Sequence, residues 1–126
     1  MPALTLKAEG GLLRQLVTDA DIFVPPAPHI KSSSIKAIWD TGATGSCITI
    51  KVVKELGLLP TGRVLMGTAN GAIQKNTYTI DIGLPGKVII QGVIASEVDA
   101  LTSGCDALIG MDIITLGDFS ITNHKG

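Results

Sequence analysis

Hydrophobic and polar residues alternate along most of this chain, which is the pattern of β-strands that bury one face. Two long runs show the alternation, Ile73 to Ile82 and Lys87 to Ile94, and Gly83-Leu84-Pro85-Gly86 between them predicts a turn. A third run leads through Val64 to Met66 into the glycine-rich segment Gly67 to Gly71, which predicts a hairpin. The chain is therefore predicted to be mostly β.

Two stretches break this alternation and predict short helices. Between Thr49 and Leu56 the apolar residues recur three to four positions apart, so we expect a helix that Thr49 caps and Gly57 ends. A second short helix is predicted from Gly110 to Gly117, followed by a closing strand at Asp118–Thr122.

The N-terminal residues are the least regular part of the pattern. A short strand is predicted at Leu4–Leu6 and a turn at Gly10-Gly11. The apolar residues that follow fit one face of a helix as well as a strand, and we favour strands throughout; they are Leu12, Leu13, Leu16 and Val17.

A proline-rich connection follows the next predicted strand, Asp21–Val24, which Pro25-Pro26-Ala27-Pro28 ends. The polar segment from His29 to Ser34 is predicted to be a hairpin loop or a mobile connection. His29 belongs to no motif, so we expect a solvated loop histidine rather than a catalytic one.

Asp40 stands where an apolar run containing Ile35 and Ile38 gives way to a loop of small residues. A carboxylate at the edge of a core stays ionised when donors point at it, and glycines allow backbone N–H groups to approach. Thr41, Thr44 and Ser46 add hydroxyl groups. One interpretation is a working carboxylate, and the other is an Asx-turn in which Asp40 only caps the loop.

Three segments in order favour the first interpretation, because Asp40-Thr41-Gly42-Ala43 resembles the active-site signature of the aspartic proteases. The family's second element, two apolar residues followed by glycine, is matched by Leu108-Ile109-Gly110, which is expected to support the catalytic loop from behind. Thr68-Ala69-Asn70-Gly71 lies where the family places its flap, a hairpin over the substrate. An ordinary hairpin turn is the alternative for these four residues.

The chain of 126 residues has one Asp-Thr-Gly segment, so the resemblance is to the retropepsin-like branch, in which two identical chains each supply one aspartate. It implies an all-β retropepsin-like acid protease fold, a closed or partly open barrel with one or two short helices, in a single domain over residues 1–126. The predicted helix after the first loop favours a cellular or bacterial member.

The resemblance also implies roles for the loop residues. Asp40 would be the catalytic aspartate, Thr41 would lock the two loops across the dimer axis, Gly42 would donate its N–H to the carboxylate, and Ala43 would line the substrate wall. No metal and no cofactor are expected. Trp39 departs from the aliphatic residue common before this aspartate, which leaves its packing open. The alternative is a catalytically silent retropepsin-fold module for dimerisation or peptide binding.

The composition limits the classes of partner that we expect for this chain. Lys and Arg number 10 against 11 Asp and Glu, and aromatic residues make up 3%, so we expect no nucleic acid as a partner. The N-terminal residues do not resemble a signal peptide and no apolar run approaches about 20 residues, so we expect no membrane as a partner and a cytoplasmic location. Cys47 and Cys105 are expected near each other, as a redox pair or, preferably, as two buried small residues. Asp106 and Asp112 are expected to be structural or solvated.

Overall fold

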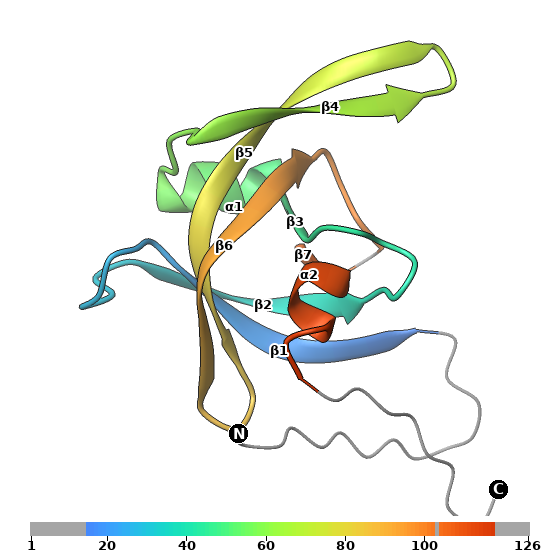
Figure 1. Cartoon of the computed structure of the whole chain (residues 1–126). Coiled ribbons are helices and arrows are strands. Elements are labelled where there is room, and N and C mark those ends of the chain that lie inside the picture. The colour runs from blue at the N-terminus through green and yellow to red at the C-terminus, as the bar shows by residue number, and fades with distance from the viewer. Residues whose placement is uncertain (1–14, 103, 118–126) are drawn as a thin grey trace, which may run out of the picture.

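The computed structural model describes residues 15–102 and 104–117, which form one seven-stranded sheet with two short helices (Figure 1). The strand order is β1-β2-β7-β3-β6-β5-β4, and an additional pairing of β1 with β5 makes the sheet partly closed. This arrangement confirms the predicted all-β fold. The elements are β1 (Leu16–Phe23), β2 (Ser32–Trp39), β3 (Cys47–Thr49), α1 (Ile50–Leu56), β4 (Gly62–Thr68), β5 (Gly71–Leu84), β6 (Val88–Val98), β7 (Ala107–Ile109) and α2 (Met111–Ile114).

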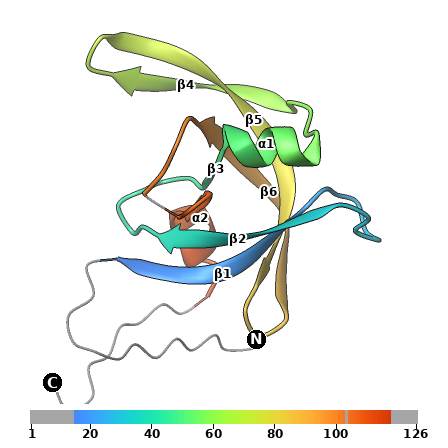
Figure 2. The same cartoon turned by 180° about the vertical axis from the view of Figure 1, so that it is seen from behind.

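Aliphatic side chains fill the inside of the curved sheet. Along β5 the core-facing residues are Tyr78, Ile80 and Ile82, which follow the alternation seen in the sequence. Val93 and Ala95 of β6 pair with Ile80 and Tyr78 and are buried with them. The helix α1 packs against β2, β3 and β6 and closes this core from one side (Figure 2).

The strands β1 and β2 form an antiparallel ribbon that runs from Leu16↔Trp39 to Phe23↔Ser32. The ambiguous residues Leu16 and Val17 are therefore strand. The strand β2 begins at Ser32, so the predicted loop was too long at its C-terminal end. One reason is a cross-strand hydrogen bond, in which the Ser34 hydroxyl donates to Asp21 Oδ1 at 2.6 Å.

The prediction that His29 is solvated was wrong. Its Nε2 lies 2.7 Å from Asp81 Oδ2, and the two side chains are only 13% and 4% exposed. The ring also stacks on Phe23, with centroids 4.4 Å apart. Asp81 is a buried carboxylate that needs donors, and besides His29 it accepts the Gly92 N–H at 2.9 Å. The proline-rich connection therefore folds back onto β5.

The helices agree with the sequence in position but not in every detail. α1 ends at Gly57, whose φ of 63° is the left-handed conformation typical of a glycine at a helix end. Thr49 was predicted to cap this helix, but its hydroxyl donates instead to Asp106 Oδ1 at 2.9 Å. The helix α2 is shorter than predicted, since it covers only Met111–Ile114.

Three predictions concern residues outside the described ranges: the strand at Leu4–Leu6, the turn at Gly10-Gly11 and the strand at Asp118–Thr122. Within residues 15–102 and 104–117, no helix has the length and apolar character needed to cross a membrane.

Candidate active site

Asp40 follows directly after β2, at the point where the backbone is held by β7. The two strands are parallel, with Trp39 opposite Ile109, and the Asp40 N–H donates to the Ile109 carbonyl at 2.9 Å. The side chain is half-buried. The strand pairing thus fixes the backbone up to the residue that carries the carboxylate.

The loop after Asp40 turns back toward its carboxylate. The Gly42 N–H donates to Asp40 Oδ1 at 2.8 Å, and the Ala43 N–H donates to the Asp40 carbonyl at 3.2 Å. A Cβ at Gly42 would lie only 3.1 Å from Oδ1, which shows how closely the backbone approaches. The Gly42 hydrogen bond is the one the resemblance implies, while the catalytic role of Asp40 stays a prediction.

The segment that follows β7 lies against the underside of this loop. The Met111 N–H donates to the Ala43 carbonyl at 2.8 Å, and the Asp112 N–H donates to the Thr44 carbonyl at 3.2 Å. At Gly110 a Cβ would lie 2.7 Å from the Gly45 carbonyl oxygen, so only glycine fits. The structure thus brings the predicted segment Leu108-Ile109-Gly110 directly behind the loop.

A contact that the sequence analysis missed closes the far end of the loop. Ser46 is buried, and its N–H and hydroxyl both donate to the Asp112 carboxylate, at 3.1 and 2.7 Å. The Ser46 oxygen in turn accepts the Gly110 N–H at 3.1 Å. Ser46 and Asp112 are 66 positions apart, and no local pattern in the sequence links them. Only the position of Asp112 at a helix start suggested a structural role.

Cys47, the first residue of β3 after the loop, carries a buried thiol. Burial raises its pKa to about 11, with smaller contributions from the negative charges of Asp112 and Asp40. Both cysteines are free. Cys47 pairs with Leu108 of β7, and Cys105 lies two residues before that strand; both side chains are buried. The structure supports two buried small residues.

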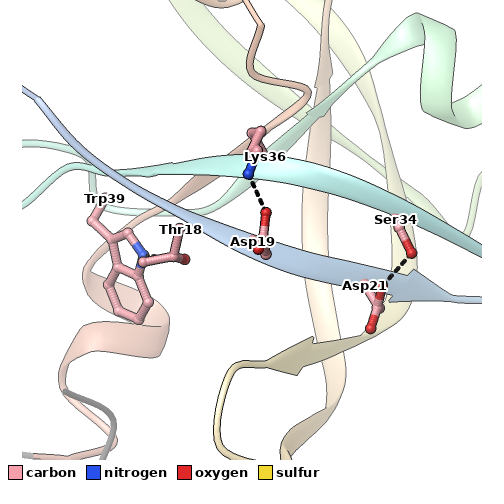
Figure 3. Close-up of polar contacts among 6 residues, drawn as sticks. All are labelled: Thr18, Asp19, Asp21, Ser34, Lys36 and Trp39. Carbon is pink, nitrogen blue, oxygen red and sulfur yellow. Dashed lines mark hydrogen bonds and ion pairs between the residues drawn. The ribbon is translucent and has the colours of Figure 1, made fainter. Parts of the chain in front are cut away.

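Trp39, the unusual residue before Asp40, packs against the core. Its Nε1 donates to the buried Thr18 hydroxyl of β1 at 2.9 Å (Figure 3). Further along the same ribbon Lys36 pairs with Asp19. The indole is therefore tied to the neighbouring strand, and the departure from an aliphatic residue is accommodated.

The predicted flap is the end of the β4–β5 hairpin. Thr68 pairs with Gly71, and Ala69-Asn70 form the turn between them. Gly71 has a φ of 112°, which favours glycine. The hairpin projects from the body of the sheet toward the end of the molecule where the Asp40 loop lies (Figures 1 and 2). Its exposed side chains include Leu65 and Met66.

One hollow on the surface lies away from Asp40. It has a volume of about 490 Å³ and lies beside the β1–β2 ribbon, with Asp19, Asp21 and Asp106 in its wall. Each of these carboxylates already has a partner, in Lys36, Ser34 and Thr49 respectively. Among the residues described, no group of three or more His, Cys, Asp or Glu side chains is placed to hold a metal ion.

Comparisons with known proteins agree with this geometry. A family model described as gag-polyprotein putative aspartyl protease matches residues 28–115. A sequence search of curated proteins finds no match. Similar solved structures include the EIAV protease with the inhibitor HBY-793, at 18% identity and a TM-score of 0.62, with 91% of this chain and 100% of that chain covered.

Two further structures have the same fold. The protease of Simian Foamy Virus (mac) is 18% identical with a TM-score of 0.57, and the match covers 79% of this chain and 92% of the viral one. A retropepsin-like aspartic protease from Rickettsia conorii is 17% identical with a TM-score of 0.54, over 89% of this chain and 95% of that one.

Proposed function

Because the chain belongs to the gag-polyprotein putative aspartyl protease family, we propose that it is an aspartic endopeptidase that acts as a homodimer. One observation carries the proposal: Asp40 stands half-buried in a loop whose Gly42 N–H binds its carboxylate, and Asp-Thr-Gly occurs once in the 126 residues. A reaction that needs two such aspartates requires a second copy of the chain, and a two-fold axis brings the same loop from each.

In this proposal the two Asp40 carboxyl groups lie a hydrogen bond apart and share one proton, because two negative charges that close repel each other. The ionised group takes a proton from a water molecule, which attacks the carbonyl carbon of the peptide bond. The protonated group donates its proton to the carbonyl oxygen, which gives a tetrahedral intermediate. As the C–N bond breaks, the carboxyl group that took the water proton passes it to the nitrogen and the other carboxylate takes a proton from the diol, which releases the amine and the acid. Thr41 locks the two loops across the axis, and Ala43 lines the wall beside the substrate.

The hairpin supplies the other half of the proposed site. Thr68, Ala69, Asn70 and Gly71 form a flap that covers an extended peptide and binds it through backbone hydrogen bonds. The exposed apolar side chains near the tip support this role, because they offer contact area to an apolar substrate residue. The chain is proposed to act in the cytoplasm.

The test is cleavage of a peptide library between about pH 4 and pH 7 by the wild type and the Asp40→Asn variant. We expect an optimum at acidic to near-neutral pH, inhibition by statine-type transition-state mimics, and loss of cleavage in the variant. Asp19→Asn is the matched control, since this carboxylate is exposed on β1 and pairs with Lys36 on the neighbouring strand, away from the Asp40 loop. Sedimentation of the wild type should give the mass of two chains.

Full activity in Asp40→Asn would contradict the proposed mechanism. A stable dimer that cleaves no peptide but binds one would instead favour a silent dimerisation or peptide-binding module.

A further inference from the structure

Resting on the proposed hydrolysis, we propose that Asp112 is a positioning residue, which holds the Asp40 loop in its reactive position by binding Ser46. Asp112 lies in the first turn of α2, and its carboxylate binds the Ser46 N–H and hydroxyl. It acts on the far end of the loop.

A pair of similar contacts makes this role testable. The strands β3 and β7 are three residues each, and a carboxylate flanking β7 binds a hydroxyl at each end of β3. Asp112 binds Ser46 before β3, and Asp106 binds Thr49 at its end. Ser46 and Thr49 are both only 3% exposed, and each hydroxyl donates its proton to the carboxylate.

The two contacts differ in what they hold. Thr49 leads into α1, whereas Ser46 is the last residue of the loop that begins at Asp40. The first residue of this loop is bound to the Ile109 carbonyl, and its middle is bound by the Met111 N–H. The Asp112 carboxylate completes the attachment, so the whole loop is fastened to one short segment, residues 109–112.

Such fastening matters because the loop contains Gly42 and Gly45, which resist displacement less than other residues do. Without the Asp112 carboxylate, the buried Ser46 N–H and hydroxyl lose their acceptor, and the loop end shifts to find another. A reacting group misplaced by about 1 Å can cost on the order of a hundredfold in rate. The loss should fall on the chemical step, since Asp112 is not placed among the residues that bind the peptide.

The experiment compares Asp112→Ala with Asp106→Ala in the full chain, at a concentration where each variant is dimeric. Both should lower Tm, and Asp112→Ala should lower it more, because it leaves the buried Ser46 N–H and hydroxyl without an acceptor, whereas Asp106→Ala leaves only the Thr49 hydroxyl. Asp112→Ala should lower kcat about tenfold or more with KM changed less than about twofold, while Asp106→Ala keeps the wild-type kcat. Asp112→Asn keeps one side-chain oxygen as an acceptor and should recover part of the lost kcat.

A second readout does not depend on activity. The amide proton of Gly42 reports its hydrogen bond to Asp40 in an NMR spectrum. Its chemical shift should change in Asp112→Ala and in Ser46→Ala, and stay unchanged in Asp106→Ala. If the wild type cleaves nothing, the proposed function fails, but this measurement still tests the positioning role.

The proposal is overturned if Asp112→Ala folds with an unchanged Gly42 amide, or if the Asp112 and Asp106 variants lose kcat equally. Should Asp112→Ala not fold, Asp112→Asn and Ser46→Ala carry the same comparison.

Discussion

The Asp40 loop and the β4–β5 hairpin differ sharply in how they are held. The loop is bound along its length by Ile109, Gly110, Met111 and Asp112. From Gly71 to Asn76, by contrast, β5 pairs only with β4 among the described strands. The molecule thus combines a loop that is bound along its length with a hairpin that projects from the sheet. For the proposed reaction this division is useful, because a reacting group must be placed closely while a substrate must enter and leave.

The largest expected effect contrasts a glycine from each region. In Gly110→Ala the new Cβ would lie within 2.9 Å of three backbone atoms of Gly45 and Ala43, which are not free to move aside. Overpacking typically costs about 1–3 kcal/mol of unfolding free energy, and we expect the upper end of this range because backbone atoms are in the way. Gly67→Ala in the hairpin places its Cβ in open space, and we expect a change within about 0.5 kcal/mol. Urea unfolding of both variants measures the difference.

Equal destabilisation by the two alanine substitutions would contradict this difference between the Asp40 loop and the β4–β5 hairpin. It would mean that the loop moves as readily as the hairpin.

A smaller effect is expected from the side chains of the hairpin. Leu65 pairs with Gln74, on the face that continues the core-facing residues of β5, whereas Met66 pairs with Ile73 on the opposite face. Leu65 is 66% exposed, so Leu65→Ala should leave Tm nearly unchanged. Loss of its apolar contact with substrate should raise KM about fivefold, and Met66→Ala should change KM less than about twofold.

A larger rise in KM from Met66→Ala than from Leu65→Ala would contradict the prediction that the Leu65 face of the hairpin meets the substrate. The face of the hairpin turned to the substrate would then be the opposite one.

The smallest expected effect concerns Cys47, the first residue of β3, which follows the Asp40 loop. Its pKa of about 11 in the folded protein exceeds the ordinary value of 9.0, so the unfolded chain loses this proton first. The stability that the neutral thiol contributes is present below about pH 9 and is lost as the pH rises toward 11. Unfolding free energy should therefore fall more steeply across this range in the wild type than in Cys47→Ala.

The titration of Tyr78 does not affect the comparison of wild type with Cys47→Ala. Its pKa is also raised, by burial and then by its hydrogen bond to Glu97, but the residue is present in both proteins and cancels in the difference. Parallel pH profiles for wild type and Cys47→Ala would show that the thiol titrates normally.

The sequence predicted the parts of the fold that are governed by local patterns. Alternation identified β5 and β6 as strands, and the spacing of apolar residues with Gly57 identified α1. The Asp40 loop was located because glycines and hydroxyl residues follow the aspartate directly. In each case the residues that decide the structure are neighbours in the chain.

What the sequence did not predict depends on distant partners. The His29 side chain binds Asp81, 52 residues away, and Ser46 binds Asp112, 66 residues away. Thr49 was expected to cap α1, but Asp106, the residue before β7, offered its hydroxyl a charged acceptor instead. A single sequence carries no signal for such pairs, because a polar residue in a loop looks the same whether it meets solvent or a buried carboxylate.

The central claim, one aspartate from each of two chains, is tested most directly by mixing subunits. Wild type and Asp40→Asn are unfolded together, refolded at a ratio of one to nine, and assayed per wild-type chain. Random pairing leaves about a tenth of the wild-type chains with a wild-type partner, so activity should fall to about a tenth. Asp19→Asn in place of Asp40→Asn should cause no such fall. Unchanged activity per wild-type chain in the Asp40→Asn mixture would contradict the account, because each chain would then work alone.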